Sequence, residues 1–202
     1  MTNFFSTKIN DVSEKALQRA MFLKETSKLG GKADEIEWLD MELEVTPRGD
    51  KKPLRLDLIG RFKKERNLVI CEVKFGNSFS PSDNPFYAAD EVVKYYELAK
   101  SNCKDLNKSH HCSSKDGFVG KDFDWKDVKD KKTKLIVVAN AAYWAYWIGH
   151  RKMQVPSSGE YNGETAVVEC YSIDVPKNLF ELQKNNRDGY FPQIDTNQLE
   201  VL

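Results

Sequence analysis

The chain lacks any long apolar run, which excludes a protein that crosses a membrane with helices. None of its 202 residues belongs to a segment approaching the roughly 20 apolar residues that a membrane-spanning helix needs. The N-terminal sequence MTNFFSTKINDVSEK also lacks the basic segment and apolar run of a secretory signal. We therefore expect a soluble, cytoplasmic protein with no membrane partner.

The chain also has few cysteines and no net charge. The four cysteines are too few and too widely spaced for a secreted disulfide scaffold, so reduced thiols are expected. The 31 basic and 31 acidic side chains cancel, which excludes attraction to nucleic acid or an anionic membrane through a global field. Any polyanionic partner must be held by a local patch.

The length fits one domain with a single hydrophobic core, and no internal repeat is visible, so residues 1–202 are predicted as one domain. Residues 101–134 are charged and lack apolar periodicity, which indicates a surface loop or insertion. Elsewhere the patterns predict helices over 11–28, 86–100 and 141–150, strands over 38–45, 54–62, 67–75, 134–140 and 166–175, and a helix or coil over 176–186. This order predicts a mixed sheet with helices on both faces.

One strand carries charges where apolar residues would be expected to continue. In NLVICEVKFG, residues 67–76, Glu72 and Lys74 lie two positions apart and therefore share a face. The preceding strand contains Asp57, and KKERN is short enough to join the two strands as a hairpin loop. A regular hairpin would bring Asp57 within reach of Glu72.

Such a trio suits phosphodiester hydrolysis. Two carboxylates hold Mg²⁺ or Mn²⁺ and leave positions for water and phosphate oxygens, while a lysine orients the water and stabilises the transition state. The alternative is an ordinary salt bridge on the solvent face of a strand. The pair Glu72 and Lys74 alone favours that alternative, whereas the addition of Asp57 and the order of elements favours a site.

At these residues the sequence resembles the PD-(D/E)XK nuclease superfamily, whose signature is an acid at the end of one strand and acid-x-Lys on the next. The resemblance covers roughly residues 11–140 by element order, with Leu56 where a proline is common. It implies an α/β fold of the restriction-endonuclease-like type, a three-layer α/β/α arrangement around a central mixed sheet. The implied activity is metal-dependent hydrolysis of phosphodiester bonds, with DNA favoured over RNA as substrate, and a homodimer is one candidate assembly.

The resemblance also implies roles for individual residues. Asp57 and Glu72 correspond to metal ligands, with the backbone carbonyl of Val73 as a further ligand. The additional acid from the first helix corresponds to Glu14, with Glu25 as the less favoured alternative. Lys74 corresponds to the catalytic lysine. The expected cofactor is Mg²⁺ or Mn²⁺.

Four further residues are candidates for contact with nucleic acid. Related exonucleases carry Gln-x-x-x-Tyr in the helix after the lysine strand; here EVVKY places Glu91 at the glutamine position and Tyr95 at the tyrosine position. The loop GNSFSPSDNP follows the lysine strand directly, so Ser78 and Ser80 are candidates for phosphate contact.

For three other features we favour a structural interpretation over a functional one. CKDLNKSHHC, residues 103–112, has zinc-ligand residue types but no Cys-x-x-Cys pair, which favours a solvated loop. YWAYW, residues 143–147, is more typical of core packing or a dimer contact than of base stacking. The alternating acids Asp40, Glu42 and Glu44 predict an exposed or edge face.

Two rival functions therefore stay open. The first is a catalytically inactive nuclease fold that binds nucleic acid or a protein partner. The second is an interaction protein that docks through the aromatic face at residues 143–147.

Overall fold

The computed structural model describes residues 14–30, 34–46, 52–76, 80–109, 121–130, 132–175 and 198–202. The described helices are α1 (Glu14–Leu23), η1 (Pro81–Asp83), α2 (Pro85–Ser109), α3 (Lys126–Asp130), α4 (Ala141–Trp144) and the π-helical turn η2 (Ala145–His150). The described strands are β1 (Thr26–Leu29), β2 (Glu35–Glu44), β3 (Arg55–Phe62), β4 (Leu68–Lys74), β5 (Lys134–Asn140), β6 (Ser158–Tyr161), β7 (Glu164–Ile173) and β8 (Gln198–Val201).

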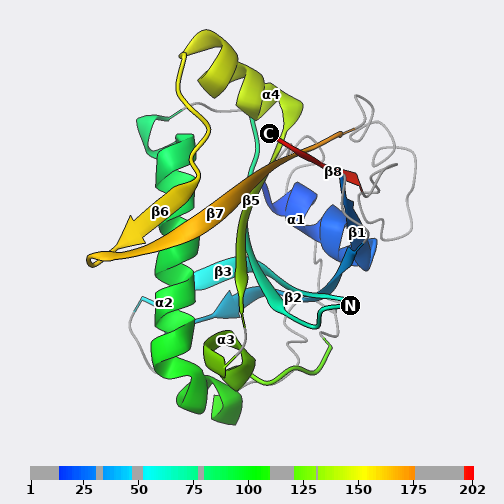
Figure 1. Cartoon of the computed structure of the whole chain (residues 1–202), viewed down its shortest axis with the longest axis vertical. Helices are drawn as coiled ribbons and strands as arrows, with labels where there is room; N and C mark the ends of the chain where they lie inside the picture. Colours follow the sequence, from blue (N-terminus) through cyan, green and yellow to red (C-terminus); the bar gives the residue numbers. More distant parts are fainter. Residues whose placement is uncertain are drawn as a thin grey trace, which may run out of the picture.

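The strands close on themselves, so the predicted three-layer α/β/α sandwich is wrong. Hydrogen-bonded neighbours follow the order β5-β4-β3-β2-β1-β8-β7, and β7 then pairs with β5 in parallel. The result is a closed, mixed, seven-stranded barrel with β6 outside it, paired with β7 (Figure 1). An open restriction-endonuclease-like sheet would leave two edges where this sheet closes.

Two short strands account for the error. β1 and β8 have four residues each, too few for a clear alternating pattern, and β1 falls partly within the helix predicted over 11–28. β8 pairs with β1 in parallel and with β7 in antiparallel fashion, which links the two halves of the sheet. Sequence periodicity identified the long strands but not the strands that close the barrel.

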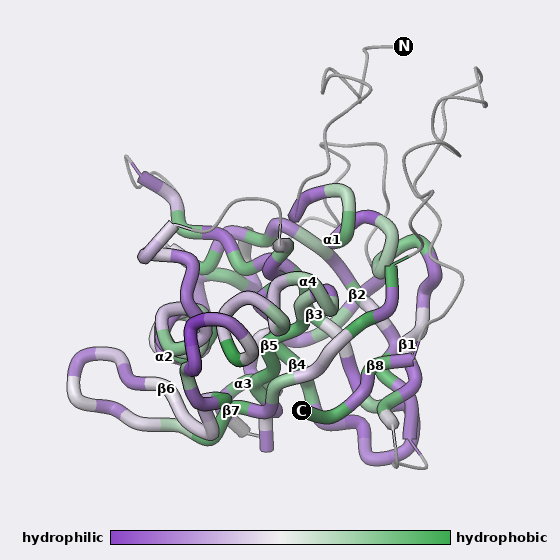
Figure 2. Tube along the Cα trace, turned by 90° about the horizontal axis from the view of Figure 1, so that it is seen from above, coloured by the Kyte–Doolittle hydropathy of each residue, from purple (hydrophilic) through white to green (hydrophobic). Residues whose placement is uncertain are grey.

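Closure creates an inner and an outer apolar core. The inner core takes side chains from all seven barrel strands and from α1, including Leu17, Trp38, Val73 and Tyr171. The outer core joins the opposite face of several of these strands to α2, α3 and α4. In Figure 1, α1 and α2 lie on opposite sides of β4 and β5, and Figure 2 shows the apolar residues of these strands near the middle of the molecule.

Several local predictions are confirmed. β3 and β4 form the predicted antiparallel hairpin. α2 begins after Asn84, whose Oδ1 accepts the N–H groups of Phe86 and Tyr87, as expected of a helix cap. Packing also explains the aromatic run, because Tyr143 and Trp147 are buried in the outer core, which leaves little aromatic surface for docking.

Other local predictions are wrong or lie outside the described residues. α2 continues to Ser109 and α3 follows, so residues 101–134 are not one loop. β2 lies between β1 and β3, so the strand that carries Asp40, Glu42 and Glu44 is not at an edge of the sheet. Asp40 is also buried, next to a bulge in β2. Of the proposed zinc ligands, Cys103 is buried on α2, and residues 110–112 lie outside the described part of the chain. Among the helices that the structure describes, none has the length and apolar character of a membrane span.

Candidate metal centre

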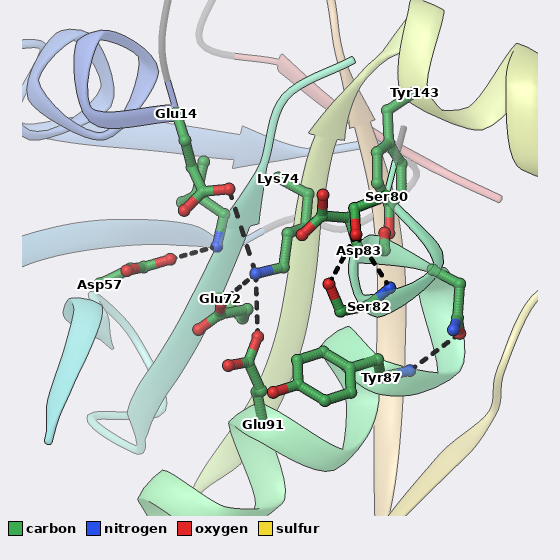
Figure 3. A network of polar contacts seen from close by, with 12 residues as sticks. Glu14, Asp57, Glu72, Lys74, Ser80, Ser82, Asp83, Tyr87, Glu91 and Tyr143 are labelled. Atoms are coloured by element: carbon green, nitrogen blue, oxygen red, sulfur yellow. Dashed lines mark hydrogen bonds and ion pairs between the residues drawn. The ribbon is translucent and has the colours of Figure 1, made fainter. Parts of the chain in front are cut away.

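Three carboxylates from three elements meet near the carboxyl end of β4. The β3–β4 register pairs Leu58 with Cys71, which places Asp57 opposite Glu72 one step further along the hairpin. Glu14 reaches the same point from the first turn of α1. One oxygen of each of Glu14, Asp57 and Glu72 lies within 4.8 Å of the other two (Figure 3). The structure therefore brings together the three acids that were expected from the sequence to be metal ligands.

The hairpin fixes the orientation of Asp57. Its Oδ2 accepts the backbone N–H of Val73 at 2.7 Å, so the carboxylate is held by the neighbouring strand rather than by solvent. A role for the Val73 carbonyl as a metal ligand stays a prediction.

Lys74 lies in the same cluster and is shared among acids. Its Nζ donates to Glu72 Oε1 at 2.7 Å and to Glu91 Oε2 at 2.9 Å, and lies 4.0 Å from Glu14 Oε2. The side chains of Lys74 and Glu72 are 9% and 3% exposed, so little solvent screens this pair. With Asp57, four carboxylates face one ammonium, an excess of three negative charges when all are ionised.

Burial and mutual repulsion shift the titration of these acids. Burial, followed by the charge of Glu14, raises the pKa of Asp57 to about 7. Burial and the charge of Asp57 raise the pKa of Glu72 well above its usual value, and burial also raises the pKa of Glu14. Burial alone would lower the pKa of Lys74, but Glu72, Glu14 and Glu91 outweigh it and raise that pKa, so Lys74 stays protonated.

The donor set fits a hard divalent cation. Glu72 Oε2 is buried and has no hydrogen-bond partner among the described residues, although Oε1 of the same carboxylate binds Lys74. A buried, unpaired carboxylate oxygen is costly unless a proton or a cation satisfies it. Three carboxylates offer only oxygen ligands, which suit Mg²⁺ and Mn²⁺ better than softer metals.

A second set of contacts fastens the chain just after Lys74. Asn140 Oδ1 accepts the N–H groups of Gly76 and Tyr143, and Tyr143 Oη donates to the carbonyl of Asp83. A Cβ on Gly76 would lie 2.4 Å from the Tyr143 nitrogen, so only glycine fits there. Sequence reasoning missed the positioning roles of Asn140 and Tyr143, because neither residue belongs to a recognisable motif.

The four candidate nucleic-acid residues have different surroundings. Glu91 binds Lys74 instead of facing solvent. Tyr95 is partly buried against the outer core, and burial together with Glu72 and Glu91 raises its pKa. Ser80 is exposed and caps η1 by accepting the Ser82 N–H, while residue 78 lies outside the described part of the chain.

The raised pKa of Asp57 predicts a pH-dependent stability. Between about pH 4 and pH 7 the folded state keeps a proton that the unfolded state, with a pKa of 3.8, has lost. Without divalent metal, the free energy of unfolding should therefore fall as pH rises from 5 to 7, by on the order of 2 kcal/mol. Urea unfolding at each pH measures this slope. Asp57→Asn should reduce this slope, leaving the contributions of Glu72 and Glu14, and an unchanged slope in that variant would contradict the assignment.

Comparisons of the chain with protein-family models, with curated proteins and with solved structures find no match.

Proposed function

We propose that the protein is a metal-dependent nuclease that hydrolyses phosphodiester bonds, with DNA as the favoured substrate. The single observation that carries the proposal is the convergence of Glu14, Asp57, Glu72 and Lys74 on one point, with one Glu72 oxygen left unpaired. The closed barrel differs from the fold that the local resemblance implied, so the proposal rests on the site and not on the fold.

Each residue has a role that its contacts support. Glu14, Asp57 and Glu72 would hold Mg²⁺ or Mn²⁺, and the Val73 N–H keeps the Asp57 carboxylate in place. When bound, such an ion neutralises phosphate charge and lowers the pKa of a water molecule. Lys74 would orient the attacking water and stabilise the developing negative charge on the phosphate oxygens.

Glu91 brings a negative charge to Lys74 that a glutamine, as in the exonucleases with Gln-x-x-x-Tyr, would not provide. The carboxylate of Glu91, on α2, accepts a hydrogen bond from the Lys74 ammonium. Glu72, on β4, accepts a second one from the same ammonium. Two acids on different elements therefore restrict the position of Lys74, and preorganisation of this kind is what electrostatic catalysis requires.

A cleavage assay tests the proposal. The purified chain is incubated with labelled single-stranded DNA, duplex DNA and RNA in Mg²⁺, Mn²⁺ or EDTA. We expect cleavage of DNA with either ion and none in EDTA. Asp57→Asn preserves an acceptor for the Val73 N–H but weakens the ion site, so it should reduce the rate at least 100-fold. Binding without cleavage by the wild-type chain would instead support an inactive nucleic-acid-binding protein.

A further inference from the structure

Two aromatic side chains in the first turn of α2, the helix that carries Glu91, are exposed to solvent. Phe86 and Tyr87 in the first turn of α2 are 43% and 45% exposed, and within the described ranges no other phenylalanine, tyrosine or tryptophan is classed as exposed. The next two residues, Ala88 and Ala89, are fully buried against the barrel. The helix therefore turns these two rings outwards while its other face is fixed in the core.

The local backbone that carries the rings is firmly held. Asn84 Oδ1 accepts the N–H groups of both Phe86 and Tyr87, and its own Nδ2 donates to the Pro81 carbonyl. Tyr143 Oη donates to the carbonyl of Asp83, which ties the start of the helix to α4. A rigid backbone lowers the entropy that is lost when a ring accepts a ligand.

The ring of Tyr87 adjoins the proposed catalytic cluster. Tyr87 lies one helical turn before Glu91, so the two share a face of α2, and Glu91 binds Lys74. In Figure 3 the Tyr87 ring extends from the first turn of α2 towards Glu91, on the side of the helix that faces Lys74. A nucleotide whose phosphate lay at the carboxylate cluster would thus have an aromatic surface next to its base.

The charges around the cluster disfavour binding through phosphates alone. Asp83 and Asp90 flank the rings in sequence, and Glu91 and the three candidate ligands lie beyond them. The chain as a whole carries no net positive charge. Because nucleic acids, duplex or single-stranded, are held largely by lysine and arginine contacts to phosphates, a nucleic acid bound here needs a contact to its bases as well.

From these observations we infer that Phe86 and Tyr87 form a stacking platform with two faces, about 100° apart around α2, for unpaired bases, and that the substrate class is single-stranded nucleic acid. The inference rests on the proposed nuclease function for the position of the phosphate. Stacking on aromatic side chains requires an accessible base face, which single strands offer and paired, stacked bases do not. It also tolerates any sequence, because every base has a face that can stack.

Binding and cleavage measured together test the inference. Fluorescence anisotropy in Ca²⁺ gives the affinity for three probes of equal length: a single-stranded DNA oligonucleotide, its duplex, and a strand of the same phosphates with abasic sites. Cleavage of the first two is measured in Mg²⁺. The proteins are the wild-type chain, the double variant Phe86→Ala/Tyr87→Ala, and Val201→Ala, which removes an exposed apolar side chain from β8.

We expect the wild-type chain to bind and cleave the single strand in preference to the duplex. The double variant should bind the single strand roughly tenfold more weakly or worse, with little change for the abasic strand, because only the base contact is lost. Val201→Ala should match the wild type. Thermal melting of each protein shows whether the substituted chains fold, which is expected since both rings are exposed.

The outcomes separate this inference from the proposed function. Cleavage that is equally strong on duplex and single strand, or single-strand binding unchanged in the double variant, would overturn the stacking platform while the nuclease assignment stands. Single-strand binding that depends on the two rings, with no cleavage by any of the proteins, would support the platform and overturn the nuclease assignment.

Discussion

Replacing Lys74 with alanine should abolish DNA cleavage and destabilise the metal-free fold. The ammonium is the proposed stabiliser of transition-state charge, so its loss should lower the rate at least 100-fold. It is also the shared partner of Glu72 and Glu91 in a site with little solvent. Removing one member of a buried ion pair leaves uncompensated charge, and we expect a loss of about 3 kcal/mol in the free energy of unfolding.

A matched lysine on α2 provides the control. Lys100 donates to Glu97 on the same helix, but its side chain is 37% exposed and the pair lies away from the carboxylate cluster. Lys100→Ala should change the free energy of unfolding by less than about 1 kcal/mol and leave cleavage intact. Urea unfolding and single-turnover cleavage of both variants make the comparison. Equal effects of the two substitutions would contradict a special role for Lys74.

Replacing Glu72 with glutamine should remove metal affinity and activity while leaving the fold stable. The amide oxygen of glutamine can still accept from Lys74, and the amide nitrogen takes the place of the unpaired Oε2. One acid is then missing from a cluster in which burial and neighbouring acids already oppose ionisation. We expect Mn²⁺ affinity to fall at least tenfold and cleavage at least 100-fold, with the free energy of unfolding changed by less than about 1 kcal/mol.

Glu97→Gln is the corresponding control, because Glu97 pairs with Lys100 on α2 and is not part of the carboxylate cluster. It should leave Mn²⁺ affinity and cleavage unchanged. Titration calorimetry with Mn²⁺, followed by cleavage and urea unfolding, measures all three quantities for both variants. If Glu72→Gln bound Mn²⁺ as tightly as the wild type, Glu72 would not be a ligand.

The different effects expected of Lys74→Ala and Glu72→Gln reflect a conflict between metal binding and the stability of the metal-free fold. Burial, followed by repulsion among acids that have too few cations, raises the pKa values of Asp57 and Glu72 and weakens the metal-free structure. Packing alone would favour apolar residues at the position of Glu72, between Cys71 and Val73 on a wholly buried strand. Departures of this kind from the rules of folding are expected at functional sites.

The sequence predicted the candidate site better than the fold. Glu72 and Lys74 interrupt an apolar strand, and Asp57 precedes them by a short hairpin, so local geometry alone was enough to bring them together. Glu14 comes from a helix distant in sequence, and its placement followed from the family resemblance rather than from any pattern. The ion pair between Glu91 and Lys74 was missed, because the spacing of α2 from β4 is set by core packing.

The barrel could not be predicted for a different reason. Its closure depends on pairings between elements far apart in sequence, β5 with β7 and β8 with β1. Strands of four residues carry too little periodicity to identify, and the apolar pattern of β5 is compatible with an open or a closed sheet. The exposure of the two rings on α2 could not be predicted either, because sequence periodicity did not distinguish Phe86 and Tyr87 from their buried neighbours.

The most direct test of the central claim, that Glu14, Asp57 and Glu72 together hold a divalent cation, is an anomalous difference map from a crystal soaked in Mn²⁺. We predict a peak between these three carboxylates, within roughly 2.0–2.4 Å of an oxygen of each. A map with no peak there, or with Mn²⁺ bound only by other residues, would contradict the account.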